Sequence, residues 1–290
     1  MLAKDRGAGD CYSRRWHNGG GVVIPILPDS AWREFRGAPK QRGQHHTTHE
    51  ALIADANGQE HKCHVKAAPL GSPMPLAEAL AWLVSEALDL PRPKFAALLH
   101  LPVQRLRVCM PLDQHWMPYQ HVLAFCASTV EGKHITGRWR WQAHLRAARA
   151  FRHEDVARIA AFDLWTENRD RHCGNFLRTR GGAYVPIDNE FILFTILWVT
   201  AGITAIHRSL QTEARTALKA DGYKRFEGHM VMASKHHAAA FGRVAPTLRN
   251  QILALVADPA QGTFLQAAIL QFLGQRAHPD WLAGELSVIP

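Results

Sequence analysis

The sequence predicts an α+β fold with two lobes, in which a small sheet-rich N-terminal lobe spans residues 1–127 and a helical C-terminal lobe spans residues 128–290. Two observations predict it. Short apolar runs separated by Gly and Pro dominate the first part, and runs of helical periodicity dominate after about residue 130. A chain of 290 residues, 47% hydrophobic and 20% charged, can bury a core for both lobes.

The first lobe contains the strongest strand signal. Residues 50–56 and 59–66 are strand-length runs on either side of Asn57-Gly58. This pair favours a hairpin because both positions of a two-residue turn need a positive φ. A further strand-like run lies at residues 22–27. Apolar-rich runs separated by prolines predict more strands at residues 96–101, 105–110 and 119–127.

Helices are predicted in both lobes. In the first lobe, apolar side chains recur at helical spacing over residues 76–88, until Leu90-Pro91-Arg92-Pro93 ends the pattern. The second lobe is expected to contain helices at residues 141–151, 155–165, 209–220, 230–241, 247–256 and 263–273, with a turn region at 177–189. The apolar run 191–206 is shorter than the roughly 18 residues that cross a membrane, so we expect a buried segment and no membrane span.

Charge and cysteine usage bear on partners and compartment. Lys and Arg outnumber Asp and Glu by 34 to 25, a balance that favours contact with phosphates, nucleic acid or an acidic protein face. The five cysteines include no CxxC pair, which argues for a reducing compartment and against a disulfide framework or structural zinc. The first 20 residues lack the apolar core of a signal peptide. We therefore expect a cytoplasmic protein.

Residues 162–191 carry the groups with the most informative spacing. Asp170 and Asn175 are five positions apart, and Asp188 follows Asn175 by thirteen, after an apolar run at 184–187. Phosphoryl transfer requires such a set, because one carboxylate must lie against the attacking hydroxyl while an amide oxygen and a second carboxylate hold Mg²⁺. The spacing therefore predicts a phosphotransferase that uses ATP and Mg²⁺.

The local residues narrow this prediction. Asn168-Arg169-Asp170-Arg171-His172-Cys173-Gly174-Asn175 with Ile187-Asp188 resembles the N-x-D-R-H-x-G-N…I-D pattern of the HipA-like kinases, and more distantly the D-R-H-x-x-N of phosphatidylinositol kinases. The resemblance implies a protein kinase-like fold and transfer of the ATP γ-phosphoryl group to a Ser/Thr hydroxyl of a protein, which could be the chain itself. It implies that Asp170 accepts or orients the hydroxyl and that Asn175 and Asp188 ligate Mg²⁺. His172 would orient the loop or accept a proton.

The resemblance also implies partners upstream. A kinase grips the α- and β-phosphates with a strand Lys that a helix Glu orients. Lys66 ends the second arm of the expected hairpin and Glu78 opens the following helix, so these two residues are the candidates. Their alternatives are a solvated strand Lys and an ordinary first-turn Glu. By position, backbone groups around Phe125 and Ala127 would bind adenine.

Two departures from the kinase pattern affect the prediction. The usual Asp-Phe-Gly reads Asp188-Asn189-Glu190, so the metal ligand is retained and Glu190 could add a carboxylate near it. The nearest candidate for a phosphate loop is residues 42–48, which contain a single Gly.

Other functions remain open. A lipid or small-molecule kinase would share every residue named above, and a pseudokinase would bind nucleotide without consuming it. The stretch 133–152 contains six Lys and Arg residues and no acid, with Trp139 and Trp141 interleaved. It is either a docking face for RNA or an acidic protein, or a solvated basic helix face.

Overall fold

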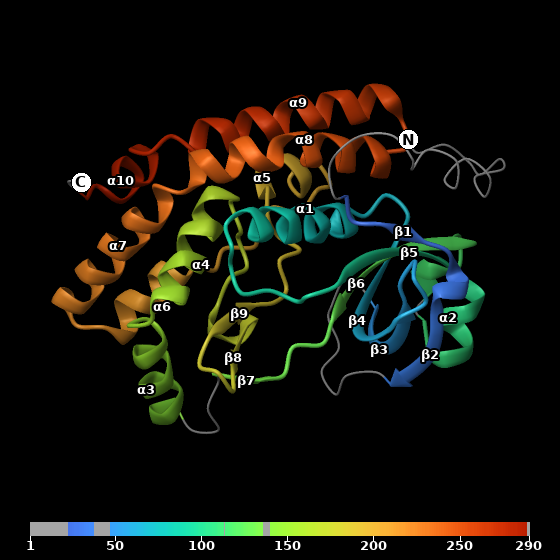
Figure 1. Ribbon diagram of the computed structural model, residues 1–290, viewed down its shortest axis with the longest axis horizontal. Helices are drawn as coiled ribbons and strands as arrows, with labels where there is room; N and C mark the ends of the chain where they lie inside the picture. The colour runs from blue at the N-terminus through green and yellow to red at the C-terminus, as the bar shows by residue number, and fades with distance from the viewer. Residues whose placement is uncertain (1–22, 38–46, 113, 136–139, 289–290) are drawn as a thin grey trace.

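The computed structural model describes residues 23–37, 47–112, 114–135 and 140–288 (Figure 1). It is a mixed α+β structure with a sheet-rich N-terminal region and a helical C-terminal region, as the sequence predicts. Within the described residues, a six-stranded sheet has the order β1-β5-β6-β4-β3-β2. Its strands are β1 (Ile26–Leu27), β2 (Trp32–Gly37), β3 (Thr47–Ala54), β4 (Glu60–Pro69), β5 (Ala96–Pro102) and β6 (His121–Ser128). A second sheet has the order β7-β8-β9, with strands Gly132–His134, Phe176–Thr179 and Tyr184–Pro186.

The predicted hairpin is β3 and β4, which pair in register from Thr47↔Ala67 to Ala54↔Glu60. Its turn is longer than the two-residue form that the Asn-Gly pair suggests. The Gly58 N–H donates to the Asp55 carbonyl at 3.0 Å, and the Asp55 carboxylate accepts from the backbone of Asn57 and Gln59. Gly58 has a φ of +80°, whereas Asn57 does not have a positive φ. The aspartate side chain thus stabilises a three-residue loop with one left-handed residue.

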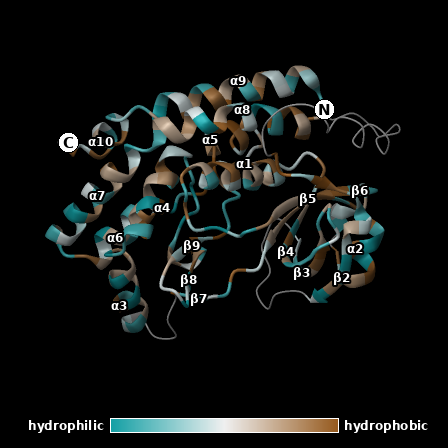
Figure 2. Cartoon of the chain, viewed as in Figure 1, coloured by the Kyte–Doolittle hydropathy of each residue, from teal (hydrophilic) through white to brown (hydrophobic). Residues whose placement is uncertain are grey.

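The two faces of the sheet differ in what they contact. Along β4, the side chains of Cys63, Val65 and Ala67 are fully buried and pack with residues of α2 (Val103–Cys109). The alternate residues, Lys66 among them, point to the opposite face because side chains alternate along a strand. That face packs against α1 (Met74–Ala87), and in Figure 2 β5 is largely hydrophobic whereas β2 is largely hydrophilic.

Helices form the remainder of the described chain. They are α3 (Arg140–Ala150), α4 (Glu154–Trp165), α5 (Phe194–Leu197), α6 (Leu210–Ala217), α7 (Ala220–Ser234), α8 (His237–Leu255), α9 (Pro259–Arg276) and α10 (Trp281–Leu286). Helix α1 lies between the sheet and α8 (Figure 1). Its end is held by the helical region, because Arg158 of α4 donates to the carbonyls of Leu88 and Asp89, and Arg243 of α8 donates to that of Ala87.

Three predicted elements differ from the structure. Residues 105–110 are not a strand, because residues 105–109 belong to helix α2, where Val103 and Leu106 are buried one turn apart and Val108 is 85% exposed; Met110 follows the helix. The predicted helix at 230–241 is wrong, because α7 ends at Ser234 and α8 begins at His237. The predicted helix at 247–256 is the second part of α8, which begins at His237 and contains Pro246.

Of the other predicted elements, some are confirmed, some are shorter in the structure, and one lies partly outside the described residues. The helix at 76–88 is α1, and the run at 22–27 contributes only the short strand β1. The predicted helix at 209–220 ends at Ala217 as α6. Residues 42–46 of the candidate phosphate loop lie outside the described residues. The division into lobes at residues 127 and 128 stays a prediction.

The apolar run 191–206 is buried in its first part. Phe191, Ile192, Leu193, Phe194, Leu197 and Trp198 are buried in the core that α1 and α8 share. Val199 and most of the residues that follow it are exposed or half-buried. None of the helices in the described chain is long and apolar enough to cross a membrane.

Candidate active site

Lys66 lies at the centre of the candidate site and contacts three carboxylates. Its Nζ donates to Glu78 Oε1 and to Asp188 Oδ1, the latter at 2.5 Å, and lies 3.6 Å from Glu190 Oε2. Strand β4 supplies the ammonium, α1 supplies Glu78, and the segment after β9 supplies the other two carboxylates. The structure therefore brings together three of the predicted site residues, from positions up to 122 apart in the chain, and adds Glu190.

The cluster around Lys66 contains more acidic than basic side chains. Burial alone would lower the pKa of Lys66, but the carboxylates of Asp188, Glu78 and Glu190 outweigh it and hold that pKa well above its ordinary value. Burial raises the pKa of Glu190 to about 8, opposed by Lys66 and reinforced by Asp188 and Glu78. One cation thus faces three acidic side chains, of which Glu190 takes up a proton more readily than a glutamate in water does.

A short turn directs both later carboxylates toward Lys66. Asp188 has a φ of +61°, a left-handed conformation that costs a residue with a Cβ roughly 1–2 kcal/mol. Asp188 and Glu190 each lie close enough to Glu78 that oxygens of all three fall within 4.8 Å of one another. Carboxylate oxygens at this spacing suit Mg²⁺, a hard cation with oxygen ligands. The side chain of Asp188 is 38% exposed, so the cluster is open to solvent on one side.

The catalytic-loop candidate, residues 168–175, follows helix α4. Buried Asn168 begins the loop, donating its amide to Asp163 and accepting the backbone N–H of Asp170 at 3.2 Å. The Asp170 carboxylate is half-buried and lies 3.6 Å from Nε of Arg208. Burial raises the pKa of Asp170, against Arg208 and His172, which lower it. Asp188 also raises this pKa, which shows that the two aspartates are close enough to interact electrostatically.

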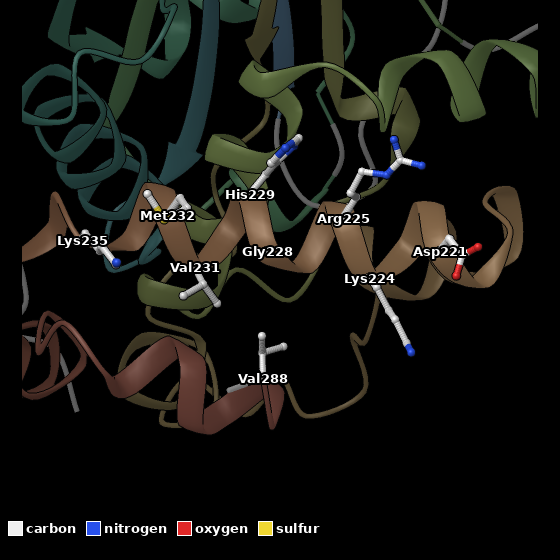
Figure 3. A pocket seen from close by; sticks show the side chains of 9 residues that line it. All are labelled: Asp221, Lys224, Arg225, Gly228, His229, Val231, Met232, Lys235 and Val288. Atoms are coloured by element: carbon white, nitrogen blue, oxygen red, sulfur yellow. The ribbon is translucent and has the colours of Figure 1, made fainter. Parts of the chain in front are cut away.

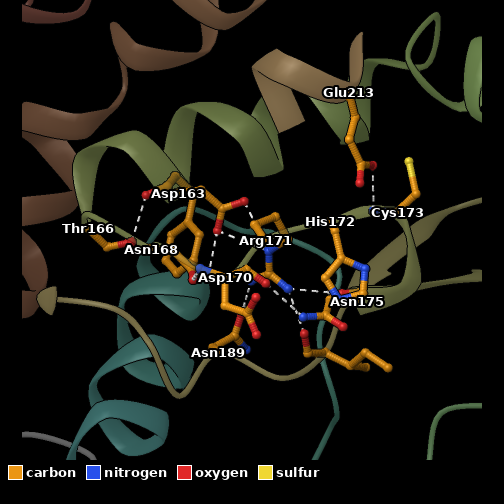
Figure 4. Close-up of polar contacts among 12 residues, drawn as sticks. Asp163, Thr166, Asn168, Asp170, Arg171, His172, Cys173, Asn175, Asn189 and Glu213 are labelled. Atoms are coloured by element: carbon orange, nitrogen blue, oxygen red, sulfur yellow. Dashed lines mark hydrogen bonds and ion pairs between the residues drawn. The ribbon is translucent and has the colours of Figure 1, made fainter. Parts of the chain in front are cut away.

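Arg171 ties the loop to the segment that carries Asp188 (Figure 4). Its side chain is wholly buried. Nε bonds both oxygens of Asp163, at 3.1 and 3.0 Å. Nη1 donates to the carbonyls of Asn175 at 2.9 Å and Ile187 at 2.5 Å, and Nη2 donates to the side chain of Asn189. One guanidinium thus fixes the residues on both sides of Asp188 in the folded chain.

The Asp163 carboxylate balances this buried cation. Burial raises the pKa of Asp163 to about 6, while Arg171 and Asn168 hold it down. The carboxyl is therefore ionised at neutral pH and pairs with Arg171. The sequence analysis did not assign a role to either residue, although Arg171 lies inside the motif. In the sequence, Arg171 is an arginine between two polar loop residues, and this pattern does not indicate that its side chain is buried.

Asn175 and His172 have their side chains engaged within the loop. The Asn175 amide nitrogen donates to the Asp170 carbonyl at 2.9 Å, which leaves its Oδ1 as the atom able to meet a cation. His172 Nδ1 accepts the N–H of Gly174 at 3.0 Å and so begins the short 3₁₀ turn Cys173–Asn175. The two predicted roles of His172, orienting the loop and accepting a proton, stay predictions.

Phe125 and Ala127 lie inside β6 and not beyond its end. They pair with Lys66 and His64 of β4 on one side, and β5 pairs on the other. Their backbone groups therefore belong to the sheet, contrary to the expected backbone contact with adenine. Their side chains lie on the face of the sheet that carries Lys66, because each is directly opposite a residue of that face. A contact with a nucleotide would come from these side chains.

A shallow cavity of about 500 Å³ lies elsewhere, along α7 (Figure 3). Its lining comprises Asp221, Lys224, Arg225, Gly228, His229, Val231, Met232, Lys235 and Val288. None of the predicted site residues borders it. The chemistry-bearing residues instead surround Lys66 and the loop at Asp170.

Comparisons with known proteins return a distant structural likeness. No protein-family model matches the chain. No curated protein matches it either. Among solved structures, the chain is similar to one in the Shewanella oneidensis MR-1 toxin–antitoxin complex of HipA, HipB and operator DNA. The two share 11% sequence identity with a TM-score of 0.47, over 88% of this chain and 68% of that one. A likeness this distant does not assign an activity.

Proposed function

We propose that the protein is an ATP-dependent phosphotransferase that transfers the γ-phosphoryl group to a Ser/Thr hydroxyl of a protein substrate. The observation that carries this proposal is the contact of Lys66 with both Glu78 and Asp188. An ammonium held between a helix Glu and a metal-binding Asp is the arrangement that positions nucleotide phosphates in kinases. In this proposal the lobes 1–127 and 128–290 enclose the nucleotide between them.

Each residue has a role set by its chemistry. Lys66 would bind the α- and β-phosphates, and Glu78 would orient its ammonium. Phe125 and Ala127 would contact the adenine through their side chains, since their backbones are paired within the sheet. Asp170 would accept a hydrogen bond from the substrate hydroxyl and aim its oxygen at the γ-phosphorus. His172 would hold the loop through Gly174.

Asp188 and Asn175 would hold Mg²⁺, and Glu190 lies near enough to take part. The fit rests on the donor set, which consists of carboxylate oxygens within 4.8 Å of one another and an amide oxygen left available by the bond to Asp170. The bound ion would neutralise charge on the transferring phosphoryl group. Arg171 would keep Asn175 and the Asp188 segment in fixed positions, since it donates to the backbone on both sides.

Intact-mass spectrometry after incubation with Mg·ATP tests the proposal directly. We expect the parent chain, or a casein substrate added to it, to gain about 80 Da per phosphoryl group. Lys66→Ala and Asp170→Asn should gain none. Asp280→Asn changes an exposed aspartate of the same chain and should behave as the parent does. Incorporation that persists in Asp170→Asn would remove that residue from its proposed role.

Two further experiments separate the alternative functions. Radiolabelled ATP offered with protein, inositol lipid or aminoglycoside acceptors distinguishes a protein kinase from a lipid or small-molecule kinase. A pseudokinase would melt at a higher temperature with Mg·ATP and leave the ATP unconsumed. No shift in melting temperature with Mg·ATP in the parent would contradict nucleotide binding itself.

A further inference from the structure

Arg208 lies beside Asp170, and most of its side chain is open to solvent. Its Nε is 3.6 Å from Asp170 Oδ1, and the side chain is 61% exposed. This distance is longer than a hydrogen bond, and ion pairs with one well-exposed partner contribute little to stability. The stability of the fold therefore does not account for an arginine at this position.

The backbone of Arg208 is fixed on the catalytic-loop candidate. Its N–H donates to the Arg169 carbonyl at 2.7 Å, and Asp170 and Arg208 form a parallel β-bridge. Helix α6, which follows Arg208, is joined to the same loop, because Glu213 accepts the N–H of Cys173 at 2.8 Å. The Cα of Arg208 is therefore held beside Asp170, while its side chain is open to a ligand.

The two arginines of the loop itself are engaged with buried partners. Arg169 donates to Glu167 at 2.9 Å, and the wholly buried Arg171 uses all three of its nitrogens in the bonds given above. The Arg208 guanidinium differs from both. Within the part of the chain that the structure describes, its one ion-pair partner is Asp170, and its N–H groups make no hydrogen bond. A set of N–H donors is thus available next to the Asp170 carboxylate.

The proposed reaction brings negative charge to this point. The acceptor hydroxyl must lie between Asp170 and the γ-phosphorus, so the carboxylate and the anionic phosphoryl group are separated by one oxygen atom. Lys66 is assigned to the α- and β-phosphates, farther along the nucleotide. A guanidinium suits the third phosphate, because its planar donors match phosphate oxygens two at a time and it keeps its charge at any pH of interest.

We propose that Arg208 is a catalytic residue, which donates hydrogen bonds to the γ-phosphoryl group as that group moves toward the acceptor hydroxyl. This inference rests on the proposed function. In the step, the hydroxyl oxygen bonds to the γ-phosphorus while the bond from that phosphorus to the bridging oxygen breaks. ADP leaves with the electron pair, the hydroxyl proton passes to Asp170, and Arg208 stays protonated throughout.

Steady-state kinetics of transfer from Mg·ATP to casein tests the role. We expect Arg208→Ala to lower kcat about 100-fold, the usual effect of removing one donor to a transition-state anion. Arg208→Lys keeps the charge without the planar donors and should lose about tenfold. Arg225→Ala, which removes an equally charged and exposed side chain on α7, should match the parent.

Chemical rescue separates a direct contact from a structural role. Guanidinium chloride, at concentrations that leave the fold intact, should restore part of the kcat of Arg208→Ala. Urea at the same concentration has the same shape and no charge, so it should not. The melting temperature of Arg208→Ala should equal that of the parent, because the side chain is exposed and the backbone bonds of residue 208 remain.

A binding measurement without turnover gives a second readout. Aluminium fluoride with Mg·ADP imitates the phosphoryl group in transit, so it should tighten the binding of ADP to the parent at least about tenfold in calorimetric titrations. Arg208→Ala should lose most of that gain and should bind Mg·ADP alone as tightly as the parent does. The contact is with the third phosphate only, so ADP by itself does not report it.

The possible failures are distinguishable. A variant Arg208→Ala that transfers phosphoryl groups as fast as the parent overturns the role of Arg208 and leaves the proposed function in place. The same holds for a slow variant that guanidinium and urea affect alike and that keeps the gain from aluminium fluoride, because its defect would then be structural. A parent that transfers no phosphoryl group overturns the proposed function, and the role of Arg208 with it.

Discussion

The two buried cations of the site have opposite surroundings. Lys66 is 15% exposed and contacts three carboxylates, so the negative charge around it exceeds its own. Arg171 is wholly buried and contacts one carboxylate and three neutral oxygens, so its charge is matched. A matched, fully bonded cation holds the fold in one arrangement. A cation that is surrounded by surplus negative charge can change partners when a metal ion or a phosphate binds.

Removing Arg171 should have the largest effect. Arg171→Met leaves the Asp163 carboxylate buried without its partner, and we expect a loss of about 3–5 kcal/mol in the free energy of unfolding. Urea denaturation followed by circular dichroism measures it. The double variant Asp163→Leu/Arg171→Met should recover part of that stability, because it removes the uncompensated charge. It should not recover phosphotransfer. A single variant as stable as the parent would contradict the role of the pair.

Removing Lys66 should have a smaller cost and a distinct signature. In Lys66→Met the acidic side chains of Glu78, Asp188 and Glu190 lose the cation that they share, and the exposure of Asp188 limits the loss to about 2 kcal/mol. Divalent cations should then replace the missing charge. We expect Mg²⁺ or Mn²⁺ to raise the melting temperature of Lys66→Met more than that of the parent.

A matched control isolates the carboxylates in that experiment. Adding Glu78→Gln to Lys66→Met removes one of the three acids and should reduce the stabilisation by cation. Equal shifts with Mg²⁺ in the parent, the single variant and the double variant would show that the cluster does not bind the ion.

His237 is a buried base that contacts no carboxylate among the described residues. His237 stacks on Trp165 with ring centroids 4.4 Å apart, and burial, with a smaller contribution from His236, lowers its pKa to about 3. The folded chain therefore keeps this ring neutral while the unfolded chain protonates it below its ordinary pKa of 6.5. The stabilisation is complete above pH 6.5 and is lost as the pH falls toward 3.

Substitution of His237 should change the acid sensitivity of the fold. Between pH 7 and pH 5 we expect the parent to lose about 2 kcal/mol of stability through this residue, and His237→Phe, which keeps the stack, to lose less. Thermal unfolding at both pH values measures the difference. His229→Gln, at an exposed position on α7, should follow the parent. Identical acid sensitivity in the parent and His237→Phe would contradict a neutral buried ring.

The sequence predicts local structure where a single pattern determines it. The hairpin at Asn57-Gly58 and the helix over residues 76–88 follow from turn residues and periodicity, and both are confirmed. The run at residues 105–110 misled because alternating Leu106, Val108 and Met110 fit a strand as well as a helix, and only burial of Val103 and Leu106 decides between them. The end of α7 at Ser234 has no Gly or Pro to mark it.

The site was predictable in its residue types and in the contact of Lys66 with Glu78, and not in its other contacts. Spacing within residues 162–191 indicates Asp170, Asn175 and Asp188, whose roles stay predictions. The position of Glu190 beside Lys66 depends on a left-handed φ at Asp188, and the amino-acid sequence does not require that conformation. The bonds of Arg171 depend on where the Ile187 carbonyl and Asn189 arrive in space, after a second strand has folded back. Such long-range geometry is not encoded in a local pattern.

The clamp on the end of α1 has a mechanical consequence. Arg158 and Arg243 fasten that helix to α4 and α8, so Glu78 is carried by the helical body, whereas Lys66 is carried by the sheet. Their ion pair therefore joins the sheet to the helices. Any swing of the sheet away from the helices would pull the ammonium off both Glu78 and Asp188 in a single movement. In the proposed function, admission of a nucleotide and alignment of its phosphates would then be one coupled event.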